Sequence, residues 1–142
     1  EALIVEAFER EAPDVIIVEG QGALSHPAYS TSALILRGSQ PDGVILQHAP
    51  GRPHRCDFAN MPMPTPRSEI ELIQAFSGAK EIGLTINHEN MSNDDVNAAN
   101  ATYSTDLIIP VTDALSQSSE HLVRMVAAAF PEIQAKLDAV FH

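Results

Sequence analysis

The sequence predicts an α/β fold: a mostly parallel sheet of about four strands with helices on both faces. Two observations predict it. Strand-like and helix-like segments alternate along the chain, and each strand-like segment is an unbroken aliphatic run. Strands buried on both faces have this pattern, and they occur in parallel sheets covered by helices. The length of 142 residues fits a single α/β domain over residues 1–142.

The elements follow from hydrophobic periodicity and helix-end signals. Helices are expected over residues 1–12, 30–39, 68–78, 93–103, 118–130 and 131–141, and strands over residues 15–18, 44–47, within 81–90 and within 105–113. Pro13 ends the first helix, and S-x-x-E and S-x-x-D capping boxes are predicted at Ser68 and Ser92. The proline-rich stretch from Ala49 to Arg67 is expected to be a long loop, and such loops are usually functional or mobile.

Composition limits the partners and the compartment. The formal net charge of −11 argues against a nucleic-acid partner and against an anionic membrane surface. The single cysteine, Cys56, excludes an internal disulfide and favours a reducing, cytoplasmic compartment. No apolar run approaches the roughly 18 to 20 residues that span a bilayer. The chain opens with Glu1 and not with Met, so an upstream segment could have been removed.

Polar residues gather after the predicted strands, where ligands bind in open parallel sheets. Glu19 ends the run 15–18, and a carboxylate there could hold Mg²⁺ or act as a general base. Gly20 and Gly22 would let the backbone approach a ligand, and His26 follows in the same loop. The alternative is a carboxylate that caps a neighbouring helix, with glycines that serve only the turn.

Basic residues gather after the second strand, in an otherwise acidic chain. His48, Arg52, His54 and Arg55 lie within "HAPGRPHRCD". Arginine suits bidentate capture of a carboxylate or phosphate, and Arg52 is the preferred member of the group. The alternative is surface arginines paired with local acids.

The third strand is followed by Asn87, His88, Glu89 and Asn90. A general base or an amide that reads adenine could stand there. The alternative is a turn, because Asn tolerates the left-handed conformation.

Two further readings of the histidines and the cysteine are less favoured. Histidines with Cys56, Asp57 and Glu19 could form a zinc site, but neither C-x-x-C nor H-x-x-x-H spacing occurs. Cys56 as a nucleophile rests only on one thiol near His54.

Three segments, "DVIIVEGQGALSHPAYS", "GVILQHAPGRPHRCDF" and "IGLTINHENMS", resemble the C-terminal domain of the DgcN-type D-glutamate N-acetyltransferase family, long catalogued as a domain of unknown function. More distantly, "VIIVEGQG" is similar to the "VEGAGG" element of dethiobiotin synthetase and related P-loop proteins. In those enzymes the Glu matching Glu19 helps to hold Mg²⁺, and the Asn matching Asn87 contacts adenine.

The resemblance implies a P-loop-like domain whose first strand and phosphate loop are missing here, because no G-x-x-x-x-G-K-[ST] motif occurs. Family members are longer and carry a Rossmann-like N-terminal domain, so the chain is expected to be the C-terminal part of a two-domain protein. The missing N-terminal half is then a partner of this domain. The strand edge left unpaired would favour a homo-oligomer.

The activity that the resemblance implies is transfer of an acetyl group from acetyl-CoA to the amino group of D-glutamate. His48, His88 or Glu19 could take the proton of the amine. The turn from Gly20 to Gly22 could stabilise the tetrahedral intermediate, and Arg52 with Arg55 could bind the dicarboxylate. The first alternative is an ATP- and Mg²⁺-dependent ligase or kinase of dethiobiotin-synthetase type, and the second is a non-catalytic regulatory or assembly domain.

Overall fold

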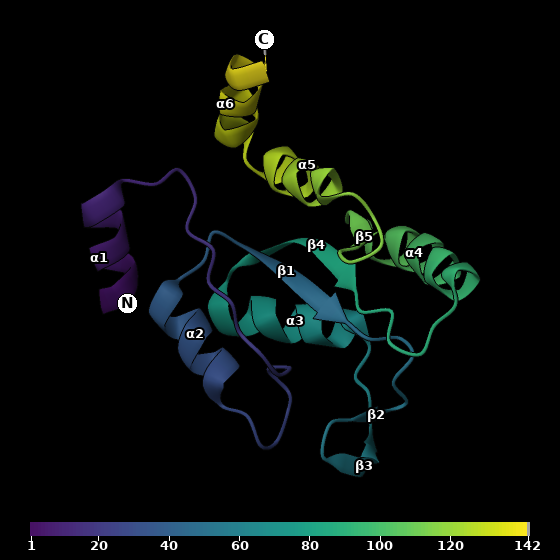
Figure 1. The fold of residues 1–142 in the computed structure, drawn as a ribbon. Helices are drawn as coiled ribbons and strands as arrows, with labels where there is room; N and C mark the ends of the chain where they lie inside the picture. The colour runs from purple at the N-terminus through teal and green to yellow at the C-terminus, as the bar shows by residue number, and fades with distance from the viewer. Residues whose placement is uncertain (142) are drawn as a thin grey trace.

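The computed structural model describes residues 1–141 and confirms the α/β class (Figure 1). In chain order the elements are α1 (Ala2–Glu11), α2 (Thr31–Ser39), β1 (Gly43–His48), β2 (His54–Arg55), β3 (Phe58–Pro62), α3 (Pro66–Ser77), β4 (Lys80–Ile86), α4 (Asn93–Leu107), β5 (Val111–Asp113), α5 (Ser119–Ala129) and α6 (Pro131–Phe141).

The main sheet has three parallel strands in the order β1-β4-β5. Its register places His48 at the end of β1 opposite Ile86 at the end of β4, and Ile86 opposite Asp113 at the end of β5. The carboxyl ends of all three strands therefore meet at one edge. The loops that follow the strands, including the loop that begins at Asn87 after β4, therefore lie on that edge.

The core lies on both sides of β4, the central strand. Leu84 and Ile86 are fully buried, as expected for a strand with neighbours on both sides. Figure 1 shows α3 along one side of the sheet and α5 along the other. On the α5 side, Met125 is buried against Gly83, which has no side chain to obstruct it.

The predicted strand at residues 15–18 is wrong. The segment is in no regular element, and Ile17 is 90% exposed. A β-strand is held by hydrogen bonds to a neighbouring strand, and within residues 1–141 β1 pairs only with β4. The β-branched residues favour an extended chain, but no ladder forms beside them.

Three element boundaries differ from those predicted. Helix α3 is capped by Thr65, whose Oγ1 accepts from the Ser68 amide, and Pro66 takes the first helical position. The predicted capping box at Ser68 is therefore wrong. Helix α4 continues to Leu107, so the fourth strand is only the short β5.

Two other local features of the chain are clear. The capping box at Ser92 is confirmed, because its hydroxyl accepts from the Asp95 amide and the Asp95 carboxylate accepts from the Ser92 amide. The expected loop from Ala49 to Arg67 contains the antiparallel pair β2–β3, so part of it is ordered by backbone pairing.

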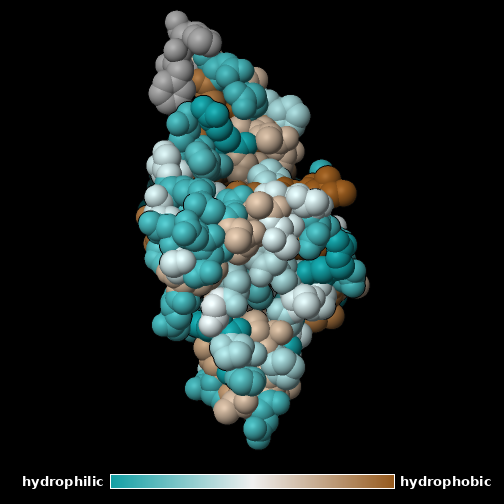
Figure 2. Space-filling model, turned by 90° about the vertical axis from the view of Figure 1, so that its right-hand side faces the viewer, coloured by the Kyte–Doolittle hydropathy of each residue, from teal (hydrophilic) through white to brown (hydrophobic). Residues whose placement is uncertain are grey.

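No helix within residues 1–141 is long and apolar enough to cross a membrane. Figure 2 looks onto the side that carries α4 and α5. Hydrophobic side chains on this side lie in small separate groups, and hydrophilic residues cover most of it.

Candidate active site at the carboxyl edge of the sheet

His88 and Asp113 form a hydrogen-bonded pair at the carboxyl edge. His88 lies two residues beyond β4, Asp113 ends β5, and His88 Nδ1 is 2.5 Å from Asp113 Oδ2. The Asp113 side chain is fully buried, whereas that of His88 is 38% exposed. A carboxylate that binds Nδ1 orients the ring and leaves Nε2 available to take a proton.

Asp113 is held in its ionised form. Burial raises the pKa of a carboxyl group, but here hydrogen bonds from the Ser116 hydroxyl, from His88 and from the Leu115 and Ser116 amides outweigh it. They lower the pKa of Asp113 to about 2. His88 therefore faces a permanent negative charge near neutral pH.

Arg52 and Glu89 form an ion pair beside this dyad. Arg52 Nε donates to Glu89 Oε2 at 2.8 Å, and Arg52 Nη2 donates to the same oxygen. The hydrogen bond to Glu89 raises the pKa of Arg52 further above its usual range. Gly51 makes this approach possible, because a Cβ at that position would collide with the Glu89 carbonyl oxygen.

An open cavity of about 580 Å³, here called the arginine cavity, lies next to this pair. The loop from Gly51 to Ala59 lines it together with Glu89 and Asn90. Arg55 contributes a buried Nη1 atom that has no hydrogen-bond partner among the described residues. A buried donor without an acceptor is costly to the fold.

A second cavity of about 510 Å³, here called the proline cavity, adjoins the first. Arg52 and Pro53 line both. His48 and Tyr103 lie in its wall, with ring centroids 5.7 Å apart in an edge-to-face arrangement. Burial lowers the pKa of His48 and raises that of Tyr103, so both rings are uncharged near neutral pH.

The two asparagines of the third predicted site segment serve the turn. Asn87 Oδ1 accepts from the Glu89 amide at 3.1 Å. Asn90 has a φ of 60°, in the left-handed region that Asn tolerates, and lines the arginine cavity. Asn90 thus joins the site, whereas the Asn87 side-chain oxygen is used within the turn.

The first predicted site segment lies elsewhere. The turn from Gly20 to Gly22 rests against α2: Ser32 Oγ donates to the Gly22 carbonyl at 2.5 Å, and Gly22 has a φ of 86°. Glu19 is exposed, and none of Glu19, Gly20 and Gly22 lines either cavity.

His26 has a structural environment. It is 8% exposed, stacks on Tyr29 with centroids 4.4 Å apart, and has Nε2 3.1 Å from the Cys56 carbonyl oxygen. These contacts join the loop after Gly22 to the β2–β3 hairpin.

Within residues 1–141, no three His, Cys, Asp or Glu side chains group closely enough to hold a metal ion. Glu19 therefore belongs to no such group of three among the residues that the structure describes. Cys56 is exposed, and its Sγ lies 3.3 Å from Arg52 Nη1.

Sequence reasoning missed two residues of this edge, Asp113 and Tyr103. Asp113 ends a strand-like run, the same signal that drew attention to Glu19, and could have been found by it. Tyr103 lies inside α4, and no sequence signal places its ring against His48.

With this geometry established, comparison with known proteins gives the family. Residues 1–123 match the family described as "Domain of unknown function (DUF1611_C) P-loop domain". The chain belongs to this family. The resemblance noted in the sequence is thereby confirmed, since proteins named D-glutamate N-acetyltransferase are among its relatives.

One such relative, from Pseudoalteromonas sp, is 31% identical over 113 residues, which cover 75% of this chain and 34% of that protein. Another, from Tritonibacter scottomollicae, is 29% identical over 119 residues, covering 79% of this chain and 35% of that protein. The chain therefore spans about a third of the length of these curated relatives.

The fold is also similar to a crystal structure of a DUF1611 family protein from Anabaena variabilis ATCC 29413. The TM-score is 0.79 and the identity 24%, over 89% of this chain and 38% of that one. At this identity the likeness supports the α/β fold of the domain and not the roles of individual residues.

Proposed function

We propose that this domain forms part of an N-acetyltransferase that moves an acetyl group from acetyl-CoA to the amino group of D-glutamate. The relatives' names supply N-acetylation of D-glutamate, and acetyl-CoA as the donor is part of our proposal. The observation that carries the proposal is the His88–Asp113 pair, which adjoins Glu89 of the arginine cavity. Amine acylation needs a base near a site that binds the acceptor. His88 directly precedes Glu89 of the cavity wall in the chain, although neither His88 nor Asp113 itself lines either cavity.

The arginine cavity suits an acidic amino acid. Arg52 and Arg55 both lie in its wall, and the Arg52 guanidinium is already paired with Glu89. Arginine binds carboxylates in a fork geometry, which matches a substrate with two carboxylates. Glu89 and Asp57, in the same wall, could accept from the ammonium group.

His88 takes the proton in this scheme. His88 Nε2 takes one proton from the ammonium group, and Asp113 stabilises the resulting imidazolium. The neutral amine nitrogen then attacks the thioester carbonyl carbon, a C–N bond forms, and the C–S bond breaks. The departing thiolate of CoA takes up the second proton that the nitrogen loses, so the products are N-acetyl-D-glutamate and free CoA.

The test is release of CoA thiol by the full-length protein supplied with acetyl-CoA and D-glutamate. We expect His88→Gln to lower kcat by about 100-fold or more, since general base catalysis contributes that much. Arg55→Gln should raise the KM for D-glutamate by about tenfold, through loss of a charged hydrogen bond.

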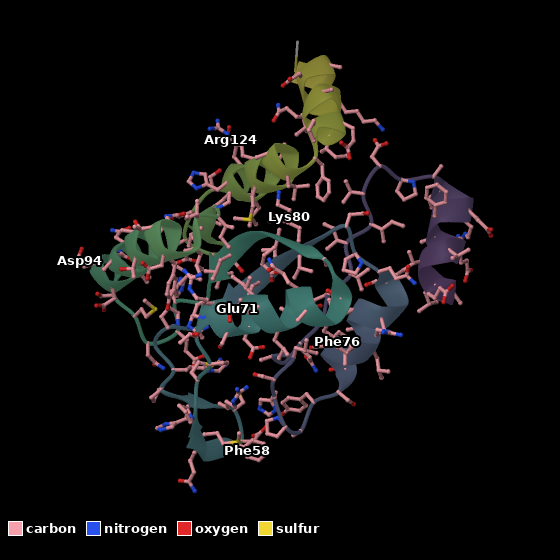
Figure 3. The ribbon with its side chains drawn as sticks, turned by 180° about the vertical axis from the view of Figure 1, so that it is seen from behind. Phe58, Glu71, Phe76, Lys80, Asp94 and Arg124 are labelled. Carbon is pink, nitrogen blue, oxygen red and sulfur yellow. The ribbon has the colours of Figure 1, made fainter. Side chains whose placement is uncertain are left out.

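His121→Gln and Arg124→Gln are the matched controls, because both residues are exposed on α5 and line neither cavity. Figure 3 shows Arg124 at the α5 end of the molecule, away from Phe58 in the wall of the arginine cavity. Hydrolysis of ATP without release of CoA would instead support the ligase or kinase alternative. Full activity in every variant would support a non-catalytic domain.

A further inference from the structure

The wall of the arginine cavity contains one carboxylate that is not paired with a cation. Its two carboxylates belong to Glu89, which accepts from Arg52, and to Asp57. Within residues 1–141, no basic group lies within ion-pair distance of Asp57, and its Oδ1 accepts no hydrogen bond. A carboxylate in this state can bind a cationic group of a ligand.

Asp57 lies at the tip of the β2–β3 hairpin. Arg55 pairs with Phe58 across the hairpin, so Cys56 and Asp57 are the two residues of its turn. Asp57 has a φ of 64°, in the left-handed region that Asp enters more readily than most residues. The preceding residue, Cys56, has its Sγ 3.3 Å from Arg52 Nη1. The turn therefore places Asp57 one residue from the contact with Arg52, in the wall that both residues share.

Tyr29 orients the Asp57 carboxylate. Its hydroxyl donates to Asp57 Oδ2 at 2.6 Å, and this bond raises the pKa of Tyr29, so the hydroxyl keeps its proton near neutral pH. The Tyr29 ring is held in turn by its stack on His26. Gly22 gives the ring its space, because a Cβ there would lie 3.1 Å from Tyr29 Cδ2. One carboxylate oxygen of Asp57 is thus fixed by Tyr29, and the other is left for a ligand.

The backbone of the same turn is held by His26. Its Nδ1 accepts from the Ala28 amide at 3.2 Å, so Nε2 carries the hydrogen and donates to the Cys56 carbonyl oxygen at 3.1 Å. The segment 26–29 therefore holds both residues of the turn, Cys56 by its backbone and Asp57 by its side chain. A group that is already held in one orientation loses less entropy when a ligand binds to it.

We propose that Asp57 binds the ammonium group of the amino-acid acceptor and that Tyr29 is the positioning residue for Asp57. This inference rests on the proposed acetyl transfer, and it names the group that distinguishes an amino acid from a plain dicarboxylate. Asp57 takes no part in proton transfer in this scheme, so its effect is on binding.

The test is calorimetric titration of the full-length protein with D-glutamate and, separately, with glutarate, the same dicarboxylate without the amino group. The parent protein should bind D-glutamate more tightly. Asp57→Asn should weaken D-glutamate binding by about tenfold, through loss of a charged partner, and change glutarate binding less than about threefold. Asparagine still accepts from Tyr29 and tolerates the left-handed turn, so this variant removes only the charge.

Tyr29→Phe keeps the ring that stacks on His26 and removes the hydroxyl. It should weaken D-glutamate binding by about threefold, and by less in an Asp57→Asn background, because the two changes act through one contact. Asp94→Asn is the matched control: Asp94 is also exposed, lies on α4 and lines neither cavity. Figure 3 shows Asp94 well away from Phe58 of the hairpin. Thermal unfolding shows whether each variant is folded.

Each outcome decides the assignment. Loss of the preference for D-glutamate over glutarate in Asp57→Asn supports it even if the protein transfers no acetyl group, in which case only the proposed function fails. A parent protein without that preference, or an Asp57→Asn variant that keeps it, would overturn the assignment and leave the proposed function standing. No binding of D-glutamate by the parent would overturn both. If Asp57→Asn does not fold, the same preference measured in Tyr29→Phe decides.

Discussion

His88 Nδ1 lies 2.5 Å from Asp113 Oδ2, and the two side chains differ sharply in exposure, at 38% and 0%. The pair therefore joins a solvent-facing base to a buried anion. The parallel register produces this contact, because Asp113 stands opposite Ile86 and His88 follows Ile86 by two residues. Any chemistry of His88 depends on the pairing of β4 with β5.

Asp113→Asn is expected to lower kcat by about 100-fold and to change the KM for D-glutamate less than about twofold. An amide cannot stabilise the imidazolium, although it fills the same space. Steady-state kinetics of CoA release measure the effect. Ser116→Ala is the control: it removes one 2.6 Å hydrogen bond to Asp113 but leaves the carboxylate. If both variants lose stability and neither loses kcat, Asp113 has only a structural role.

The buried carboxyl group of Glu81 should make the stability of the folded protein depend on pH. It is 3% exposed, and neither carboxylate oxygen has a hydrogen-bond partner among the described residues. Burial raises its pKa from 4.5 to about 7. The folded state then binds the proton more tightly than the unfolded state, so the contribution of Glu81 is full below pH 4.5 and is lost as the pH rises to about 7.

The loss amounts to about 3 kcal/mol in the free energy of unfolding. Denaturant unfolding of the protein at several pH values between 5 and 8, with the same titration of Glu81→Gln, measures it. The Gln variant should lack this part of the pH dependence and should be more stable than the parent at pH 8. Identical pH profiles for the two proteins would contradict the prediction.

Arg52→Lys is expected to raise the KM for D-glutamate by about tenfold, because a lysine cannot reproduce the contact of two nitrogens with Glu89 that holds this wall of the arginine cavity. Lysine keeps the positive charge of Arg52, so the change in KM reports the loss of the guanidinium geometry alone. Arg124→Lys is a close match, since Arg124 also pairs with a glutamate, Glu120, but on the exposed face of α5. Equal KM values in the two variants would remove Arg52 from the binding site.

The ends of two strands could be predicted, because the strands of a parallel sheet are buried on both faces and appear in the sequence as unbroken aliphatic runs. β1 and β4 were found in this way, and with them His48, His88 and Glu89. Asp113 was not assigned to His88, because their contact depends on the β4–β5 register across 25 residues of chain. Hydrophobic periodicity reports which strands are buried, but it does not report which strands are neighbours.

Residues 15–18 are an aliphatic run that forms no strand. Their β-branched side chains favour an extended backbone, and the backbone here is irregular and in no ladder. Composition can predict the conformation that a segment prefers, whereas a strand also needs a neighbour to bond. Of the residues predicted as a site from that strand end, Gly20 and Gly22 lie against α2 and Glu19 is exposed, and none of the three lines either cavity.

Gly83→Ala should destabilise the fold by about 1 to 3 kcal/mol, the usual cost of overpacking a core. A Cβ at residue 83 would collide with the sulfur of Met125, which is 2% exposed and has little room to move. Denaturant unfolding of the protein measures the loss, and adding Met125→Ala should recover part of it, because the two changes are coupled. Gly78→Ala is the control: a Cβ there meets nothing within 4 Å, and its φ of 75° makes its cost one of backbone strain. The cost of Gly78→Ala should be the same with and without Met125→Ala. If Met125→Ala changed the cost of both glycine substitutions equally, the packing of α5 on β4 at Gly83 would be contradicted.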